Sequence, residues 1–300
     1  MTVEAYIARL AGEVERALDG VLPAEWDVPA RLREAMMYSL KAGGKRIRPV
    51  LVLAAAEAVR GDDSAAEAAM PAACAVELVH TYSLIHDDLP AMDDDDFRRG
   101  KPTNHKVFGE AMAILAGDAL LTHAFHLIAE AGLSGRLPSG AALAITADLA
   151  RLAGASGMVG GQAADMLGEQ GVTTLDDLKY IHLHKTSDLI VFSLTAGGRA
   201  AGASGAQIGA LAAFGERIGL AFQIQDDILD VIGDEQVLGK KTSSDEKSRK
   251  VTYPYLIGLD KSRAEVERLT REAQEVLLDA GLRKPDVLLG IAEYLMRRDH

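Results

Sequence analysis

The sequence has few of the residues on which disulfide-linked, nucleic-acid-binding or β-sheet proteins depend. Its single cysteine, Cys74, excludes an intrachain disulfide and favours a reducing compartment. The 44 acidic residues outnumber the 32 basic ones, and the net charge of −12 argues against a surface for nucleic acid or anionic membranes. Aromatic residues make up only 5% of the chain, and alternation of β-branched and aromatic residues is scarce. The chain is therefore expected to be helical.

Signals for export or membrane insertion are also missing from the sequence. The first ten residues lack the basic and apolar regions of a signal peptide. The best candidate for a membrane span, Ala111–Ala129, is interrupted by Asp118, His123 and His126, so we expect no membrane span. These features predict a soluble cytoplasmic protein.

Segments with helical periodicity, rich in Ala and Leu, cover most of the chain. They are Val3–Leu18, Ala30–Ala42, Pro49–Val59, Ala65–His86, Ala111–Ala131, Ala141–Leu152, Leu175–Gly197, Ala206–Ile232, Arg263–Asp279 and Pro285–Arg298. Glycines predict where helices stop: Gly43-Gly44, Gly61, Gly132, Gly154–Gly161, Gly197-Gly198 and Gly233. No Pro/Ser linker and no repeat of fixed period divides the chain, so residues 1–300 are predicted to form one all-α domain around a central cavity. The most apolar helices, Ala65–His86 and Ala206–Ile232, should be central.

Two aspartate clusters each follow a run that is otherwise apolar. The first contains Asp87, Asp88 and Asp93, and the second contains Asp226, Asp227 and Asp230. Asp226 and Asp230 are four residues apart and share one helix face. Pro90 is expected to end the first helix, so that the chain folds back and brings Asp93 near Asp87 and Asp88. Because buried carboxylates need partners, the clusters predict one site that holds cations between them, and a ligand set of oxygens alone indicates magnesium.

Other metal sites fit the sequence less well. His123 and His126 are three residues apart on an apolar helix but have no obvious third ligand. The run Asp93–Asp96 is not an EF-hand loop, because Phe97 stands where the third oxygen ligand belongs.

Gly43–Pro49 is a glycine turn that carries several cations. Lys45 and Arg48 either bind phosphate oxygens or belong to an ordinary exposed loop, and the turn alone does not decide between these. The turn is not a Walker A loop, because Arg46 stands where Ser or Thr would bind magnesium.

A second basic segment, Phe97–Thr103, follows directly after the acidic run Asp93–Asp96. Arg98 and Arg99 either form weak surface ion pairs or bind the oxygens of a polyphosphate whose metals the carboxylates hold. The adjacent acidic cluster favours the second interpretation.

Taken together, these motifs resemble the trans-isoprenyl diphosphate synthases, most closely those of bacteria that make farnesyl diphosphate. The matching segments are Gly43–Pro49, His80–Thr103, Gly117-Asp118, Gly161–Met166, His184–Thr186, Phe222–Asp230 and Lys250–Pro254. A single DDxxD motif would be weak evidence, whereas two in this order with basic segments between them are specific. The resemblance implies an all-α bundle around a deep cavity, a homodimer, and three magnesium ions between the aspartate helices.

The resemblance also implies a role for individual residues. Asp87, Asp93 and Asp226 would be the main magnesium ligands, with Asp88, Asp227 and Asp230 assisting. Arg98, Lys185 and Lys240 would hold the allylic diphosphate, Lys45, Arg48, His80 and Arg99 would hold isopentenyl diphosphate, and Gln162 and Lys250 would also bind substrate. Thr186, Gln223 and the carbonyl of Lys185 would face the developing cation. The sequence departs from the family at Ser187-Asp188, where Asp188 has no evident role, and in a segment around 239–250 that would close over the phosphates.

The implied reaction ionises an allylic diphosphate, dimethylallyl or geranyl, and joins the cation to isopentenyl diphosphate, with loss of a proton. Tyr82 lies about 7–8 Å along the helix from Asp87, a depth that suits a floor beneath a short prenyl chain, with the small Ser83 beside it. The expected product is farnesyl diphosphate, with geranylgeranyl diphosphate as the alternative. Less favoured alternatives are a terpene cyclase, a phosphohydrolase using His86-Asp87, and a non-catalytic subunit of a partner synthase.

Overall fold

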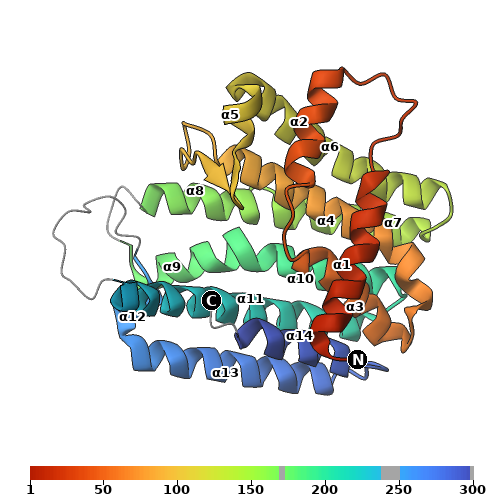
Figure 1. Cartoon of the computed structure of the whole chain (residues 1–300). Helices are drawn as coiled ribbons and strands as arrows, with labels where there is room; N and C mark the ends of the chain where they lie inside the picture. The colour runs from red at the N-terminus through yellow and green to blue at the C-terminus, as the bar shows by residue number, and fades with distance from the viewer. Residues whose placement is uncertain (169–172, 238–250, 298–300) are drawn as a thin grey trace. The chain divides into compact units, whose positions relative to one another are not determined.

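The computed structural model describes residues 1–168, 173–237 and 251–297, and almost every element in them is a helix (Figure 1). The helices form two compact units. Unit 1 comprises Met1–Leu149 and Phe192–Ala203, and unit 2 comprises Ala150–Val191 and Ser204–His300. The predicted all-α class is confirmed.

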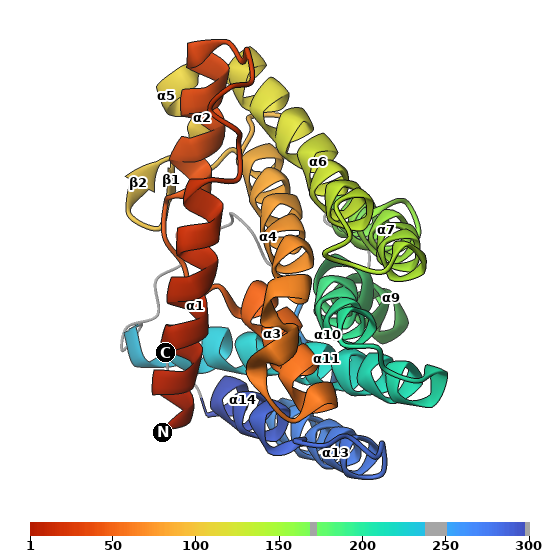
Figure 2. The ribbon, with the colours of Figure 1, turned by 90° about the vertical axis from the view of Figure 1, so that its right-hand side faces the viewer.

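Unit 1 is built around the helix that ends at the first aspartate cluster. Its elements are α1 (Val3–Asp19), α2 (Ala30–Leu40), α3 (Ile47–Arg60), η1 (Asp63–Ala65), α4 (Ala66–Asp87), β1 (Phe97–Arg98), β2 (Lys101–Pro102), α5 (Asn104–Phe108), α6 (Glu110–Leu133), most of α7 (Ser139–Ala153) and the C-terminal part of α10 (Asp188–Ala200). Helix α4 packs against α1, α2, α3 and α6 (Figure 2). Its residues from Ala69 to Val79 are almost all buried, which confirms that this helix is central.

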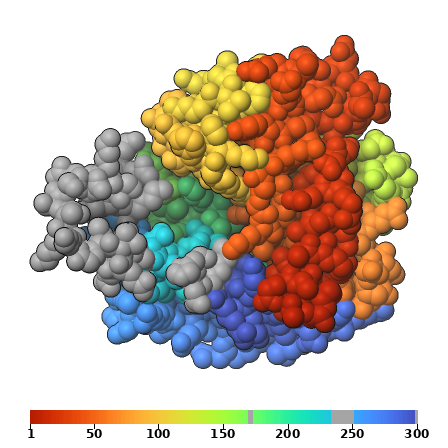
Figure 3. Space-filling model, viewed as in Figure 1, coloured from red at the N-terminus to blue at the C-terminus, as the bar shows by residue number. Residues whose placement is uncertain are grey.

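A short antiparallel hairpin follows the first aspartate cluster. Strands β1 and β2 pair Phe97 with Pro102 and Arg98 with Lys101. Helix α5 follows directly and packs against α2, and the hairpin and α5 lie beside α2 on one face of the unit (Figure 3). The sequence patterns did not predict the hairpin or α5, because both are shorter than a periodic window.

Unit 2 is built around the helix that carries the second aspartate cluster. Its further elements are α8 (Met158–Gly168), α9 (Leu175–Ile181), the π-helical turn η2 (His182–Ser187), α11 (Gly205–Val237), α12 (Tyr253–Ile257), α13 (Leu259–Leu278) and α14 (Asp286–Met296). Helix α11 packs against η2, α12, α13 and α14. Its buried residues Leu220, Ala221, Ile224 and Ile228 form a core with Tyr253, Val266 and Leu269.

The helix predicted over Leu175–Gly197 is divided in the structure. Thr174 forms a capping box with Asp177, and α9 begins at Leu175, where the predicted helix also begins. The π-helical turn η2 then separates α9 from α10. A π turn accommodates one extra residue per turn, which hydrophobic periodicity does not reveal.

Several glycines predicted to stop helices lie inside them instead. Gly132, Gly161, Gly197-Gly198 and Gly233 are within α6, α8, α10 and α11. A Cβ at Gly197 would lie 2.0 Å from the carbonyl oxygen of Val52, and one at Gly161 would lie 2.2 Å from the backbone nitrogen of Lys185. These two glycines allow neighbouring backbones to approach closely. In the sequence alone, a glycine needed for such a contact looks the same as a glycine that stops a helix.

Three helical segments are long and apolar enough to cross a membrane by length and composition: Asp63–Asp87, Glu110–Leu133 and Ser139–Gly168. Glu110–Leu133 contains Ala111–Ala129, so the expectation that Asp118, His123 and His126 exclude this stretch was wrong by length and composition. Within the protein, 72% of the apolar window in Asp63–Asp87 is buried, against 39% in each of the other two. Most of the apolar window in the first of these segments is therefore covered by neighbouring helices of unit 1.

Candidate active site

The first aspartate cluster lies where α4 ends. Asp87 is the last residue of α4 and Asp88 is its C-cap. The chain then turns back, and the backbone N–H of Asp93 donates to the carbonyl of Asp87 at 2.8 Å. The predicted fold-back at Pro90 is confirmed. Carboxylates at the C-terminal end of a helix are disfavoured by its dipole, so their presence here suits a bound cation.

Within this cluster, Asp88 is held by the arginine from the hairpin. Its Oδ1 accepts from Arg98 Nε at 2.7 Å and lies 2.5 Å from Arg98 Nη2. Burial raises the pKa of Asp88, and the ion pair with Arg98 opposes that rise. Arg98 also lies 3.6 Å from Asp95, so the hairpin brings this guanidinium directly to the acidic cluster.

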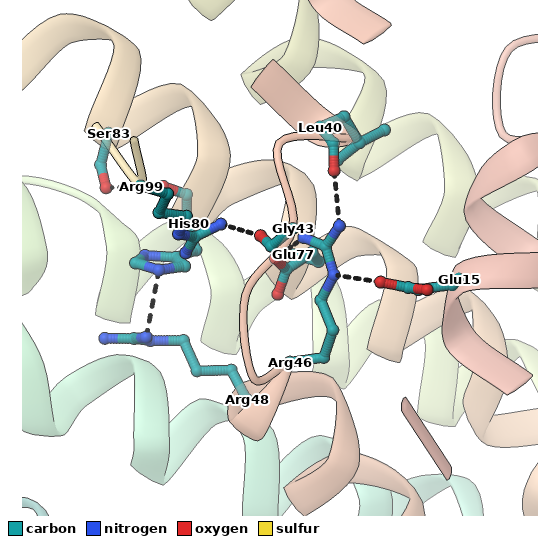
Figure 4. A network of polar contacts seen from close by, with 9 residues as sticks. All are labelled: Glu15, Leu40, Gly43, Arg46, Arg48, Glu77, His80, Ser83 and Arg99. Atoms are coloured by element: carbon teal, nitrogen blue, oxygen red, sulfur yellow. Dashed lines mark hydrogen bonds and ion pairs between the residues drawn. The ribbon is translucent and has the colours of Figure 1, made fainter. Parts of the chain in front are cut away.

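The basic loop contains one arginine with a structural role (Figure 4). Arg46, in the left-handed conformation at φ 50°, pairs with buried Glu77 at 2.5 Å and donates to the carbonyl of Leu40 at 2.6 Å. Glu15 lies 3.6 Å from its Nε. The charge of Arg46 is thus neutralised inside unit 1. This pair was not predicted, although Glu77 in an apolar run was a visible signal for it in the sequence.

Arg48 of the basic loop and Arg99 of the hairpin converge on His80 (Figure 4). Arg48 Nη1 lies 3.3 Å from His80 Nε2, and Arg99 donates to the carbonyl of Gly43. Burial and the nearby arginines, first Arg48 and then Arg99, hold the pKa of His80 well below its ordinary value. His80 is therefore neutral, and its Nε2 accepts from Arg48.

Glycine makes this convergence possible. Gly44 has φ +128°, and a Cβ there would lie 2.7 Å from the guanidinium carbon of Arg99. Burial lowers the pKa of both Arg48 and Arg99. The carboxylate of Glu77 opposes this for both groups, and neighbouring arginines lower each pKa further. Two crowded guanidinium groups beside a neutral imidazole form a site that a bound anion would stabilise.

Tyr82 and Ser83 lie one turn before the aspartates on α4. The Tyr82 side chain is buried, and its ring meets that of His86 edge-on at 5.6 Å. Burial, with a smaller contribution from Asp87, raises the pKa of Tyr82 to about 12, so its hydroxyl stays protonated. Ser83 Oγ donates to the carbonyl of His80 at 2.9 Å.

In unit 2, the turn η2 carries Lys185 and Thr186. Lys185 Nζ pairs with Asp165 of α8 at 2.6 Å, a partner that the sequence analysis missed. His184 Nδ1 lies 2.8 Å from Asp188, whose pKa is raised by burial and lowered by His184. Asp188, which had no evident role, is thus explained as the partner of His184.

The second aspartate cluster lies on α11. Gln223 precedes Asp226 by three residues and Asp227 by four on this helix, which covers the predicted segment Ala206–Ile232. Asp227 Oδ2 lies 3.1 Å from His182 Nε2 and accepts from the backbone N–H of Tyr253 at 2.9 Å. Asp227 therefore connects α11 with η2 and with the start of α12.

Three further predicted site residues are Gln162, Lys240 and Lys250. Gln162 lies on α8, and its buried side-chain amide has no hydrogen-bond partner in the described part of the chain. Lys240 and Lys250, and the segment 239–250, lie outside the described residues.

Among residues 1–168, 173–237 and 251–297, no three His, Cys, Asp or Glu side chains are gathered closely enough to hold a metal ion.

The family can now be identified. The polyprenyl synthetase family model matches residues 29–278, and the chain belongs to this family. It is 48% identical to a farnesyl diphosphate synthase of Geobacillus stearothermophilus over 300 residues, which cover 100% of this chain and 99% of the relative. It is also 48% identical to a chloroplastic geranylgeranyl pyrophosphate synthase of Catharanthus roseus, covering 99% of this chain and 82% of the relative.

Solved structures resemble the chain over almost its whole length. One is an FPP/GFPP synthase from Zymomonas mobilis in its apo form, with a TM-score of 0.85 and 36% identity, covering 98% of both chains. Another is a geranyltransferase from Legionella pneumophila, with a TM-score of 0.85 and 35% identity, covering 99% of this chain and 97% of the other. The resemblance inferred from the motifs is confirmed.

Proposed function

We propose that this protein is a magnesium-dependent prenyltransferase that condenses isopentenyl diphosphate with dimethylallyl and geranyl diphosphate to give farnesyl diphosphate. The observation that carries the proposal is the convergence of Arg48, neutral His80 and Arg99 in the same unit as the first aspartate cluster. The positive charge of this site favours binding of an anion, and the carboxylates of the first aspartate cluster are then available to bind metal. Family membership and the names of the relatives point to the same reaction.

Isopentenyl diphosphate is assigned to the cations of the glycine turn. Arg48 and Arg99 lie beside His80, and the exposed Lys45 belongs to the same turn as Arg48. A doubly charged diphosphate relieves the repulsion between the guanidinium groups and fits their bidentate geometry. Arg98 and Lys185, with Lys240, are assigned to the allylic diphosphate.

Carboxylates from each of the two clusters are assigned to magnesium, three ions in all, as the family resemblance implies. The donor set is made only of hard oxygens, and in the first cluster it stands at the unfavourable end of a helix dipole, so the residues fit a divalent cation. When bound, magnesium neutralises the allylic diphosphate and makes it a leaving group. Asp87, Asp93 and Asp226 are proposed as the main ligands.

The cation produced by ionisation requires dipoles and protection from water. The hydroxyl of Thr186, the amide oxygen of Gln223 and the carbonyl of Lys185 are assigned to this task, since oxygen dipoles stabilise a positive centre without reacting with it. The attack of the isopentenyl double bond forms the new carbon–carbon bond. A proton is then lost from the condensed product, and the released diphosphate is its acceptor.

The wider assignments rest on the same family. The family model runs through both compact units, which supports a single prenyltransferase domain over residues 1–300. We also propose a homodimer in the cytoplasm without a membrane span, in which the partly exposed apolar helices are covered by protein. Light scattering that finds an active monomer at working concentration would contradict the dimer.

Geranylgeranyl diphosphate remains the alternative product, because relatives named for either product are equally identical to the chain. A terpene cyclase and a phosphohydrolase become disfavoured by the family match.

To test the function, the protein is incubated with isopentenyl diphosphate, each allylic starter and magnesium, and the products are identified by mass spectrometry. Prenyl diphosphates lengthened by isopentenyl units are expected. A cyclic hydrocarbon or free phosphate as the main product would reject the proposal.

Substitutions in the hairpin should separate the two substrates. We expect Arg99→Ala to raise mainly the KM for isopentenyl diphosphate and Arg98→Ala mainly that for the allylic substrate. Loss of a charge-assisted hydrogen bond costs about 1.5–3 kcal/mol, which corresponds to roughly 10–150-fold in KM. Steady-state kinetics with each substrate varied in turn provide the measurement. Equal effects on both KM values in both variants would reject the assignment.

The buried pair of Arg46 and Glu77 gives a prediction about stability. Glu77→Ala leaves Arg46 buried without its carboxylate, so we expect it to lower the free energy of unfolding by about 3–5 kcal/mol. In the matched control, Arg46→Met combined with Glu77→Leu, no buried charge is left, and most of the loss should be recovered. Urea unfolding measures both. A loss below about 1 kcal/mol in Glu77→Ala, typical of an exposed ion pair, would contradict the structural role.

A further inference from the structure

Asp227 belongs to a cluster assigned to metal, but one of its carboxylate oxygens is bonded within the protein. One of its oxygens, Oδ2, lies 3.1 Å from His182 Nε2 and 2.9 Å from the backbone nitrogen of Tyr253. A carboxylate only accepts hydrogen bonds, so both nitrogens are donors. Each carboxylate oxygen offers about two lone pairs, and both on Oδ2 are in use.

His182, one of the two donors, is the first residue of the π-helical turn η2. Its ring stacks nearly parallel to that of Tyr253, with centroids 5.7 Å apart and an interplanar angle of 14°. Its carbonyl accepts from Ser187 Oγ at 3.1 Å, so the first and last residues of the turn are bonded to each other. The bond from Asp227 to His182 therefore holds a residue that is itself bonded to the other end of the turn.

The turn is also held closely by glycines on two helices. A Cβ at Gly161 of α8 would lie 2.2 Å from the nitrogen of Lys185, and one at Gly219 of α11 would lie 2.5 Å from Ser187 Cβ. Lys185 Nζ is in turn paired with Asp165 of α8 at 2.6 Å. The backbone that carries Lys185 and Thr186 is thus packed between two helices, and Asp227 holds the side chain of its first residue, His182.

We propose that Asp227 is a positioning residue for the turn η2, acting through His182, and that it is not a magnesium ligand. It differs in this from Asp226, which is proposed to bind the metal. The inference rests on the proposed function, because the turn is important for catalysis only if Lys185 and Thr186 act on the allylic substrate. It revises the role assigned to Asp227 by the family resemblance.

The first arm of the test compares asparagine substitutions. Asp227→Asn keeps an acceptor for His182 and Tyr253 but is a poor magnesium ligand. We expect it to retain most of kcat and to leave the magnesium concentration for half-maximal activity unchanged, whereas Asp226→Asn should raise that concentration. Asp227→Ala and His182→Ala should each lower kcat by about 10–100-fold, the range for residues that orient a catalytic group, with no change in the KM for isopentenyl diphosphate.

The second arm needs neither metal nor substrate. Hydrogen exchange of the backbone amides of η2 is measured in the full chain without magnesium. Asp227→Ala and His182→Ala should both speed the exchange in η2, and the combined variant should exchange no faster than the faster single one, because both remove the same bond. Asp226→Ala, one residue away on α11, should leave this exchange unchanged.

Two results would overturn the inference. One is a magnesium requirement raised as much by Asp227→Asn as by Asp226→Asn, and the other is unchanged exchange of η2 in Asp227→Ala. Failure of the proposed function gives a different pattern, in which the unsubstituted protein forms no prenyl diphosphate while the exchange in η2 still depends on Asp227 and His182.

Discussion

Asp226→Ala and Asp87→Ala are each expected to abolish most prenyl transfer while the helices remain folded. A metal ion contributes several kcal/mol to stabilising the leaving diphosphate, and about 1.4 kcal/mol corresponds to a factor of ten, so kcat should fall by about a thousandfold. Asp87 stands at the C-terminal end of α4, where a negative charge is disfavoured by the helix dipole, so its removal should not destabilise that helix. Initial rates over a range of magnesium concentrations give the measurement.

The control for this experiment is Asp176→Ala, which removes an exposed carboxylate of α9 that belongs to neither cluster. It should retain normal kcat and normal magnesium dependence. Circular dichroism of each variant shows that the helices persist. Near-normal activity of Asp226→Ala with an unchanged magnesium dependence would remove the basis for the proposed metal site.

Tyr82→Ala is expected to lengthen the product to twenty carbons or more. The buried ring of Tyr82 lies about 7–8 Å along α4 from Asp87, and the growing prenyl chain is expected to run along this helix away from the metals. Removing the ring opens space for a further isopentenyl unit. The measurement is the proportion of each product length, determined by mass spectrometry with isopentenyl diphosphate in excess. This proportion does not depend on how much of the variant folds.

The matched control for Tyr82 is Tyr82→Phe. It keeps the ring and removes only a hydroxyl, so it should still stop at fifteen carbons. Because Tyr82→Ala also leaves a cavity in unit 1, Tyr82→Leu provides a second variant with less lost volume. If both Tyr82→Ala and Tyr82→Leu still stop at fifteen carbons, Tyr82 is not the floor, and the product prediction loses its physical basis.

Much of the helical architecture could be predicted from the sequence, because amphipathic and apolar runs identify helices of three turns or more. The fold-back after Asp87 was predictable for a local reason, since Pro90 cannot continue the helix. Helix α8 was missed because its glycines look like a stop signal, whereas Gly161 is needed for close contact with the backbone of Lys185. Such contacts depend on residues far apart in the sequence.

In the candidate site, too, the features set by neighbouring residues could be predicted, whereas those set by the packing of distant segments could not. Residue types and spacing identified both aspartate clusters and the basic loop. They could not separate Arg46, whose charge is neutralised by Glu77, from Arg48, which lies beside His80, because the difference comes from α4 packing against the loop. The π-helical form of η2 and the bond from His182 to Asp227 were likewise outside the reach of periodicity and spacing.

The proposed reaction is tested by measuring both products, prenyl diphosphate and free diphosphate, when the unsubstituted protein is supplied with dimethylallyl diphosphate, excess isopentenyl diphosphate and magnesium. Farnesyl diphosphate is expected as the main prenyl product, with two diphosphate ions released for each dimethylallyl unit consumed, and no reaction is expected when magnesium is chelated. Release of diphosphate without consumption of isopentenyl diphosphate, or transfer that persists without magnesium, would contradict it.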